Sequence, residues 1–315
     1  MSAIVSSELL CKWYGKVVGI NNFSVNIKPG VTGLLGPNGA GKTTFIKLLV
    51  GALRPSAGQL TVMGEPVWGN RRLLGRLGYC PEHEGVYDDL TGLEFVSFLG
   101  RLSGMSGADA LRRANEELDR LGLSKADRQR QLGEYSKGMR QRAKLAQALI
   151  HDPQLVLLDE PLTGCDPVAR VQITRLIREL GQQGKGVIVS SHILHEVEAM
   201  TSEILLVYQG QVLAEGNIYQ IREMIDAHPH KIRLECDDPR ALGRLLIAFD
   251  EVRSLEFPGG GVLVIETPAP DACYPLIPRM ALENGIKIQA LTSPDNNLQA
   301  VFEYLTRDRG PEGVA

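Results

Sequence analysis

The chain has 315 residues, of which 43% are hydrophobic and 23% are charged, and its formal net charge at pH 7 is −3. This composition excludes a largely disordered chain and leaves room for one large domain and one smaller domain. The slight negative charge is unlike the clustered basic charge of nucleic-acid-binding domains, so we expect no nucleic acid among the partners.

The cysteines argue against disulfide bonds and a zinc site. They lie far apart, form no Cys-x-x-Cys pair and are odd in number: Cys11, Cys80, Cys165, Cys236 and Cys273. Such a set fits a reducing cytosol. The N-terminus lacks a basic segment before an apolar run, and no stretch approaches the roughly 18 uninterrupted apolar residues of a spanning helix. We therefore expect a chain that neither leaves the cell nor crosses a bilayer.

The start of the chain combines short strands with a strand, a turn and a helix. Residues 7–27 form short β-like runs, residues 31–35 a compact apolar strand, and residues 43–50 a helix. Between the last two lies a match to the phosphate-binding pattern G-x-x-x-x-G-K-[ST]. The matching residues and their neighbour are Gly36, Pro37, Asn38, Gly39, Ala40, Gly41, Lys42, Thr43 and Thr44. Because the pattern stands between a strand and a helix, as a P-loop requires, a mere glycine-rich turn is the weaker interpretation.

This P-loop predicts a site for ATP and Mg²⁺. Its glycines let backbone N–H groups turn inward, and the start of the following helix adds positive potential. We expect Lys42 to reach the β- and γ-phosphates and the Thr43 hydroxyl to ligate Mg²⁺.

Helices dominate residues 82–126, and strands and helices alternate after them. The expected elements are helix 139–150, strand 155–158, helix 169–180, strand 186–190 and a hairpin over 204–213 that turns at Gln209 and Gly210. Such alternation indicates a parallel sheet with crossover helices. The sequence therefore predicts an α/β domain that ends near residue 216.

Two acids, Asp159 and Glu160, end the apolar strand 155–158. A carboxylate in that place can hold Mg²⁺ through water, and the next one can orient the water that attacks ATP. On its own, an acidic pair after a strand is more often a solvated strand end or a helix cap. Behind a P-loop, the catalytic interpretation is favoured.

The character of the sequence changes past residue 216. Expected strands cover residues 231–237, 251–257, 262–267 and 286–292, and expected helices cover 239–249 and about 275–284, where Pro275 and Pro278 leave the helix start open. The order β-α-β-β-α-β is the ferredoxin-like, split βαβ arrangement. A last helix from Asn296 would place Leu298, Val301, Phe302 and Leu305 on one face.

A third motif, from Tyr135 to Arg142, carries a family resemblance. It resembles the LSGGQ signature of ABC ATPases, in a form similar to that of ABC-2-type exporter members. In that family this helix start meets the γ-phosphate of ATP bound to the opposite subunit. The resemblance implies this role for Ser136, Lys137, Gly138 and Met139. Outside the family, Ser136 would be read as an ordinary helix N-cap.

Further positions follow the order of the ABC family. Tyr14 matches the aromatic residue that stacks on adenine, Asp166 lies in the loop between the two sites, and His192 matches the switch histidine at the γ-phosphate. Outside the family, Tyr14 would be an ordinary core or surface tyrosine, Asp166 part of an Asp-Pro turn, and His192 a structural or solvated histidine. Glu82 stands where the family usually carries Gln, keeping an oxygen for Mg²⁺ but losing the amide donor.

The resemblance covers about residues 7–215 and implies a P-loop core of ABC-ATPase type. We expect an N-terminal antiparallel β-subdomain, a helical subdomain at about 83–150, and an ATPase domain over 1–216. A small α+β accessory domain over 217–315 completes the expected architecture.

The implied function is ATP binding and hydrolysis that drives transport, with export favoured, through separate membrane subunits. Lys42, Glu160 and His192 are the expected catalytic residues, and Thr43, Asp159 and Glu82 are the expected groups at the metal. A second such subunit, identical or related, would complete two ATP sites on the cytoplasmic side of the membrane. The alternatives are a soluble ABC-type ATPase not coupled to a transporter, and a module that binds ATP without hydrolysing it.

Overall fold

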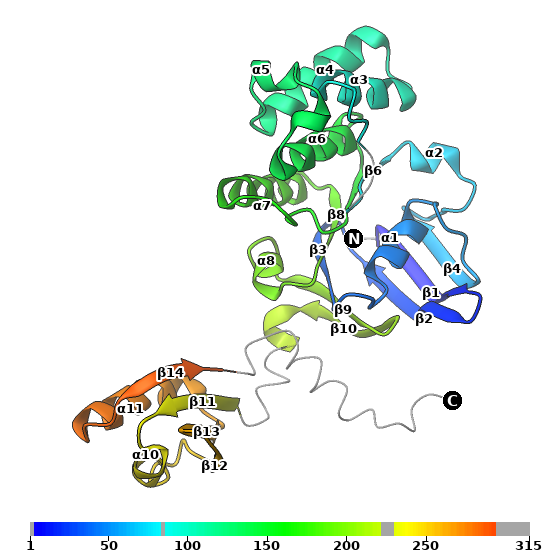
Figure 1. Ribbon diagram of the computed structural model, residues 1–315. Coiled ribbons are helices and arrows are strands. Elements are labelled where there is room, and N and C mark those ends of the chain that lie inside the picture. The colour runs from blue at the N-terminus through cyan, green and yellow to red at the C-terminus, as the bar shows by residue number, and fades with distance from the viewer. Residues whose placement is uncertain (1–2, 83–85, 222–229, 294–315) are drawn as a thin grey trace. The chain divides into compact units, whose positions relative to one another are not determined.

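The chain folds into two compact units, Met1–Asn217 and Ile218–Ala315. The computed structural model describes residues 3–82, 86–221 and 230–293 (Figure 1). Both units combine helices and sheets, which confirms the predicted fold class. Each unit has a hydrophobic core made of its own residues.

The first unit begins with a four-stranded antiparallel sheet in the order β2-β1-β4-β5. Its strands are β1 (Val5–Tyr14), β2 (Val17–Ile27), β4 (Ala57–Val62) and β5 (Glu65–Pro66). In the second half of β2, Phe23, Val25 and Ile27 are buried and alternate with exposed residues. This period of two is that of a strand with one face on the core. The structure confirms the N-terminal β-subdomain and adds β4 and β5.

The second sheet has six strands in the order β10-β9-β3-β8-β7-β6. Its strands are β3 (Gly30–Leu35), β6 (Leu77–Cys80), β7 (Leu155–Leu158), β8 (Gly186–Ser191), β9 (Glu203–Tyr208) and β10 (Gln211–Asn217). All its neighbouring strands are parallel except β9 and β10, which form the predicted hairpin. Parallel strands bring their carboxyl ends to one edge, so the residues after β3, β7 and β8 meet there.

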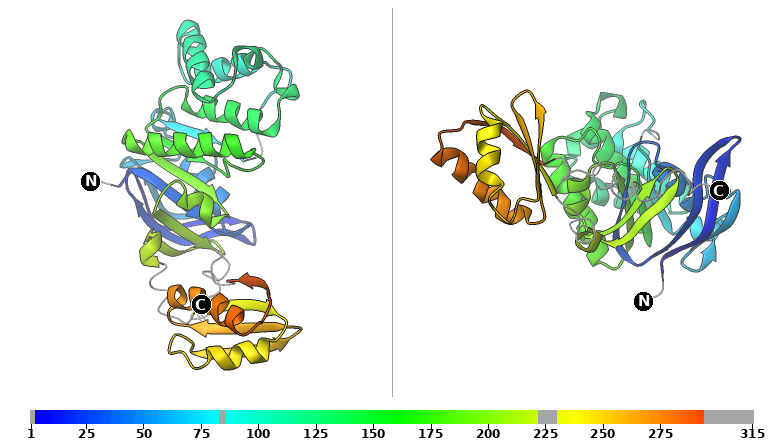
Figure 2. Two further views of the ribbon diagram at one scale, coloured as in Figure 1. Left: turned by 90° about the vertical axis from the view of Figure 1, so that its left-hand side faces the viewer. Right: turned by 90° about the horizontal axis from the view of Figure 1, so that it is seen from below.

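Helices cover the sheet and form a helical subdomain at one end of the first unit (Figures 1 and 2). Beside the sheet lie α1 (Lys42–Leu49), α2 (Arg71–Leu74), α7 (Pro167–Gln182) and α8 (Leu194–Glu198). The subdomain contains α3 (Gly92–Leu102), α4 (Gly107–Arg120), α5 (Lys125–Arg128) and α6 (Lys137–Leu149).

Side-chain caps fix where the subdomain helices begin. Thr91, Ser106, Ser124 and Ser136 each accept a hydrogen bond from the backbone N–H three residues further on. In return, the Glu94 carboxylate accepts a hydrogen bond from the Thr91 N–H at 2.9 Å, which completes a capping box. The cap at Ser136 therefore positions the first turn of α6, which carries the signature motif.

The second unit is a four-stranded antiparallel sheet with two helices. Its elements are β11 (His230–Cys236), α10 (Pro239–Leu246), β12 (Ser254–Gly259), β13 (Val262–Thr267), α11 (Pro270–Glu283) and β14 (Ile288–Thr292), and the strand order is β12-β13-β11-β14. This is the predicted β-α-β-β-α-β arrangement. Its core includes Leu234, Leu246, Leu263 and Ile277.

The structure settles the start of α11, which the sequence left open at about residue 275. The helix begins at Pro270, whose fixed φ and missing N–H suit a first helical position. Pro275 and Pro278 lie inside the helix, although each lacks the N–H of a regular helical bond. Burial of Cys273, Leu276 and Ile277 against the sheet offsets that loss. The expected last helix from Asn296 lies outside the described residues.

We expect a fragment of residues 1–221 to fold without the rest of the chain, because its two core clusters consist of residues before 208. The fragment keeps the buried side chains of Ile218 and Ile221. Thermal unfolding followed by circular dichroism should show one cooperative transition, and ATP titration should give an affinity within about threefold of the full chain. A fragment with no cooperative transition would show that the second unit is needed for folding.

Candidate functional site

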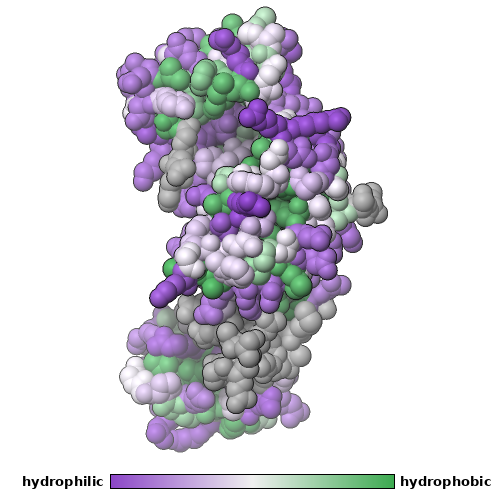
Figure 3. All heavy atoms as spheres, turned by 90° about the vertical axis from the view of Figure 1, so that its right-hand side faces the viewer, coloured by the Kyte–Doolittle hydropathy of each residue, from purple (hydrophilic) through white to green (hydrophobic). Residues whose placement is uncertain are grey.

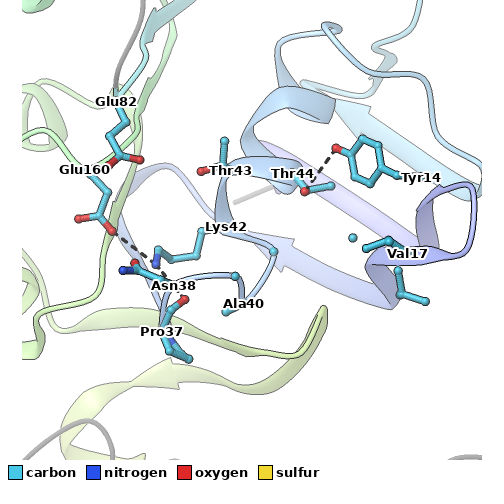
Figure 4. Close-up of a pocket in the computed structure, with 14 residues that line it drawn as sticks. Tyr14, Val17, Pro37, Asn38, Ala40, Lys42, Thr43, Thr44, Glu82 and Glu160 are labelled. Atoms are coloured by element: carbon cyan, nitrogen blue, oxygen red, sulfur yellow. Dashed lines mark hydrogen bonds and ion pairs between the residues drawn. The ribbon is translucent and has the colours of Figure 1, made fainter.

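A cavity of about 470 Å³ opens where the carboxyl ends of the parallel strands of the six-stranded sheet lie. It is lined by Tyr14, Val17, Val18, Gly19, Pro37, Asn38, Gly39, Ala40, Gly41, Lys42, Thr43, Thr44, Glu82 and Glu160. Tyr14 marks one end, while Glu82 and Glu160 mark the other (Figure 4). The cavity thus joins the β-subdomain, the P-loop and the acidic strand end.

Close packing holds the P-loop in place and requires glycine at two positions. A Cβ on Gly36 would lie 2.4 Å from the Val207 carbonyl oxygen, and one on Gly41 would lie 2.7 Å from the Gly19 carbonyl oxygen. Gly41 also has a φ of 106°, which other residues rarely adopt. The first turn of α1 has neither a side-chain cap nor an acidic residue. Its N–H groups are therefore available to a phosphate.

Lys42 is buried and points back across the loop. Its Nζ donates to the carbonyl oxygens of Gly36 at 2.6 Å and Pro37 at 3.3 Å. It also lies 3.4 Å from Glu160 Oε1, and both side chains are less than a tenth exposed. The ammonium thus lies between the P-loop and the acidic end of the cavity, where a bound phosphate would compete for it.

A hydrogen-bond network joins the ends of β7 and β8. Ser190 Oγ donates to Asp159 Oδ1 at 2.7 Å and accepts from the Glu160 N–H at 2.8 Å. Glu160 Oε2 lies 3.0 Å from His192 Nδ1. Glu160 has a left-handed φ of 48°, a strained conformation that turns its side chain toward Lys42. The structure therefore brings Lys42, Asp159, Glu160 and His192 together, as the sequence predicted. It adds Ser190, which bonds to both acids and had no predicted role.

The acidic end fits a divalent cation. Asp159 Oδ2 and Glu160 Oε1 are buried and lack a hydrogen-bond partner among the described residues. Glu160 Oε1 has the Lys42 ammonium at 3.4 Å, whereas a buried carboxylate oxygen such as Asp159 Oδ2 is costly unless a cation compensates. Figure 4 shows the Thr43 hydroxyl on the side that faces Glu82 and Glu160. The described residues contain no group of three His, Cys, Asp and Glu that would hold a metal by itself. Mg²⁺ does not require one, because it takes most of its oxygens from phosphates and water.

Tyr14 lies at the opposite end of the cavity, at the end of β1. The residue is 44% exposed, its hydroxyl lies 3.5 Å from Thr44 Oγ1, and Lys12 Nζ lies 5.5 Å from the ring centroid. Val17 and Val18 line the cavity beside it and were not predicted from the sequence. An exposed aromatic ring next to apolar side chains is a suitable surface for a planar base.

The signature residues do not line this cavity. Ser136 caps α6, its Oγ accepting from the Met139 N–H at 3.2 Å, and Ser136 and Lys137 are exposed. Gly138 faces the loop of Asp166, because a Cβ on Gly138 would lie 3.4 Å from Asp166 Oδ2. Asp166 in turn caps α7. The structure therefore gathers the signature and Asp166 on a separate surface of the same unit.

The carboxylate of Asp166 accepts a hydrogen bond from the Ala169 N–H at 2.9 Å. This bond holds the pKa of Asp166 below its usual value. Tyr135, the first residue of the signature, is buried, and its hydroxyl donates to the Asp127 carbonyl oxygen at 2.7 Å. Tyr135 therefore anchors the motif in the helical subdomain.

Comparison with known proteins identifies the family. Residues 20–163 match the ABC transporter family. An uncharacterised ABC transporter ATP-binding protein of Bacillus subtilis is 37% identical over 70% of this chain and 73% of its own length. The chain belongs to the ABC transporter ATP-binding proteins. A related protein of Synechocystis is 40% identical over 73% of this chain, but the match spans only 65% of that relative.

A longer match extends through the second unit. The bacitracin transport ATP-binding protein BcrA of Bacillus licheniformis is 29% identical over 97% of this chain and 98% of its own length. Among solved structures, an ATP-binding subunit of an ABC transporter has a TM-score of 0.64 at 27% identity, over 70% of this chain and 93% of that one. The ABC-type fold of the first unit is therefore confirmed. In the part of the chain that the structure describes, every helix is too short or too polar to cross a membrane.

We predict that Lys42→Ala weakens ATP binding at least about tenfold, or ~1.4 kcal/mol, because the variant loses the buried ammonium at the phosphate end of the cavity. Lys47→Ala is the matched control, since Lys47 lies on the same helix but does not line the cavity. Isothermal titration with Mg-ATP measures both. Equal affinities for the two variants would contradict the assignment of the P-loop.

Proposed function

We propose that this chain is the ATP-hydrolysing subunit of an ABC transporter and acts on the cytoplasmic side of a membrane. The observation that carries the proposal is the buried Glu160 carboxylate, which lies between the buried Lys42 ammonium and the exposed His192 ring. A P-loop alone would support only nucleotide binding. A buried carboxylate held beside it supports hydrolysis as well.

In this proposal the chain's own residues position ATP and water. The P-loop N–H groups and Lys42 would bind the phosphates, and Thr43, Asp159 and Glu82 would hold the metal. Bound Mg²⁺ would neutralise charge on the phosphates. Glu160 then accepts a hydrogen bond from the attacking water and orients it toward the γ-phosphate. The bond from His192 Nδ1 to Glu160 Oε2 keeps that carboxylate in place.

A second copy of the chain, or a related subunit, would complete each site. Ser136 and Lys137 lie at the exposed start of α6, outside the cavity of their own chain. A helix start with free N–H groups favours an anion. We therefore infer a head-to-tail pair in which each signature meets the γ-phosphate held by the other subunit.

The helical subdomain offers a surface for a membrane subunit. A groove of about 630 Å³ is lined by Tyr87, Asp89, Leu90, Glu94, Ser97, Phe98 and Arg101. Tyr87 and Phe98 are exposed, and hydrophobic side chains gather on this subdomain at the top of Figure 3. An apolar groove with a charged rim suits a helical segment of a partner.

The names of several relatives favour export. Two are the bacitracin transport protein of Bacillus licheniformis and a daunorubicin/doxorubicin resistance protein of Streptomyces peucetius, the second 35% identical over 78% of this chain. Others are named Nod factor export proteins, including one of Cupriavidus metallidurans that is 35% identical over 70% of this chain. Their cargoes differ widely, so we assign no substrate.

We expect Glu160→Gln to bind ATP at least as tightly as the wild type and to lose about 10²–10⁴-fold in turnover. The amide keeps the volume of the side chain but removes a charge that faces the phosphates. Unable to hydrolyse ATP, the variant should accumulate as a dimer with Mg-ATP and not with ADP. Size-exclusion chromatography with light scattering measures this.

Ser136→Asp in the Glu160→Gln background tests the signature. Aspartate keeps the helix cap, but its charge would repel the γ-phosphate of the partner's ATP. ATP binding should persist while the dimer is lost. A dimer that forms equally well with this second change would place the signature elsewhere than at the partner's ATP.

The membrane interface has its own test. Phe98→Asp should lower the membrane-bound fraction of the protein in its native host about tenfold, because it places a charge in the apolar groove. Leu111→Asp is the control, since Leu111 is 49% exposed on α4 and outside the groove. Fractionation followed by immunoblotting measures both. Equal membrane binding of the two variants would show that this groove does not contact the membrane subunit, whereas absence of the wild-type protein from the membrane fraction would favour a soluble ATPase.

A further inference from the structure

Strand β6 lies at the edge of the six-stranded sheet, with β7 on its inner side. On that side, the Cys80 carbonyl oxygen accepts from the Asp159 N–H at 2.9 Å. Since carbonyl groups alternate along a strand, those of Leu77 and Tyr79 point away from β7. An edge strand leaves such groups without strand partners, and other parts of the protein have to satisfy them.

One face of α6 and His151, two residues beyond its end, supply these partners. Gln147 Nε2 donates to the Tyr79 carbonyl oxygen at 2.6 Å, and His151 Nε2 to that of Leu77 at 2.9 Å. Burial lowers the pKa of His151, which fits a neutral ring with its proton on Nε2. Gln141 Nε2 lies 3.5 Å from Cys80 Sγ. Together with Lys144, these residues are three, three and four positions apart, which places them on one side of α6 and of the turn that follows it.

Lys144 lies on the same face of α6, but its side chain contacts a residue that follows β6. Its Nζ donates to the Glu82 carbonyl oxygen at 2.7 Å, and the side chain is only 6% exposed. Glu82 is the residue whose side chain lines the cavity beside Glu160. A buried ammonium is costly unless it makes strong hydrogen bonds, so this contact constrains the Glu82 backbone more than a neutral one would.

The charge of Lys144 also acts near the acidic end of the cavity. Burial raises the pKa of the Cys80 thiol to about 12, while the Lys144 ammonium lowers it and the Asp159 carboxylate raises it. Both charges are therefore close enough to influence the same thiol. Lys144 approaches this region from α6, whereas Lys42 approaches it from the P-loop.

We propose that Lys144 is a positioning residue that holds Glu82 at the metal end of the cavity. The inference rests on the proposed function. Helix α6 would then have two roles. Its first turn presents the signature to the partner's nucleotide, and its buried face holds Glu82 toward the nucleotide of the same chain. A displacement of α6 at the dimer interface would then move Glu82, which links the two nucleotide sites through one helix.

Lys144→Met tests the proposal, because it removes the ammonium and keeps a long unbranched side chain. Binding of ATP across a Mg²⁺ titration is the readout, and it requires no turnover. We expect the Mg²⁺ concentration at half-maximal binding to rise at least about threefold, and turnover at saturating ATP to fall about tenfold. Lys144→Arg keeps the charge and the donors and should restore most of both.

Gln147→Met is the matched control, since it removes a bond to β6 from the same helix face without touching Glu82. Amide exchange over residues 77–82 should rise in both methionine variants, but only Lys144→Met should change the Mg²⁺ dependence. In a Glu82→Ala background, Lys144→Met should have no further effect on Mg²⁺ dependence, because the two residues act together.

The outcomes separate this inference from the proposed function. Wild-type protein without Mg²⁺-dependent ATP binding would overturn both. Normal wild-type binding with an unchanged Mg²⁺ dependence in Lys144→Met would overturn only the role of Lys144. So would equal shifts in the Lys144→Met and Gln147→Met variants, or a full effect of Lys144→Met in the Glu82→Ala background.

Discussion

The nucleotide site depends on the balance of buried charge at the end of β7. Asp159 and Glu160 are 1% and 7% exposed, and one oxygen of each lacks a hydrogen-bond partner among the described residues. Buried carboxylates are stable only when donors or cations face them. Ser190, His192 and Lys42 provide part of this compensation. The remaining negative charge attracts a cation, so the burial that makes these carboxylates costly also favours the binding of a metal.

The order of the sheet explains how these groups meet. Strand β8 lies between β3 and β7, so His192 follows the strand that separates the P-loop from the two acids. Because β3, β8 and β7 are parallel, the P-loop, His192 and the two acids all lie at the same end of the sheet without long loops. The hairpin of β9 and β10 supports the P-loop, since the Gly210 N–H donates to the Ala40 carbonyl oxygen at 2.9 Å.

Sequence patterns predicted the parts of the structure that depend on local residues. The P-loop, the strand Leu155–Leu158 and the turn at Gln209 and Gly210 were all placed correctly, because glycine spacing and apolar runs encode them directly. The strands β4, β5 and β6 were not identified, since glycine and polar residues interrupt the apolar pattern of β4 and β6 and β5 has only two residues. Ser190 and Lys144 could not be assigned roles, because their partners lie 31 and 62 residues away in the chain. Local sequence carries no signal for such contacts.

The first turn of α6 and its buried face have to keep a fixed angle to each other, which limits how the length of the helix can change in evolution. The helix turns by about 100° per residue, so one inserted or deleted residue between Ser136 and His151 would rotate every later side chain out of line with the signature. Gln147 and His151 would then point away from β6, leaving edge carbonyls without donors. Substitutions in this segment alter single contacts, whereas an insertion or deletion would disconnect the helix from the strand. The spacing of the segment is therefore constrained separately from the identity of its residues.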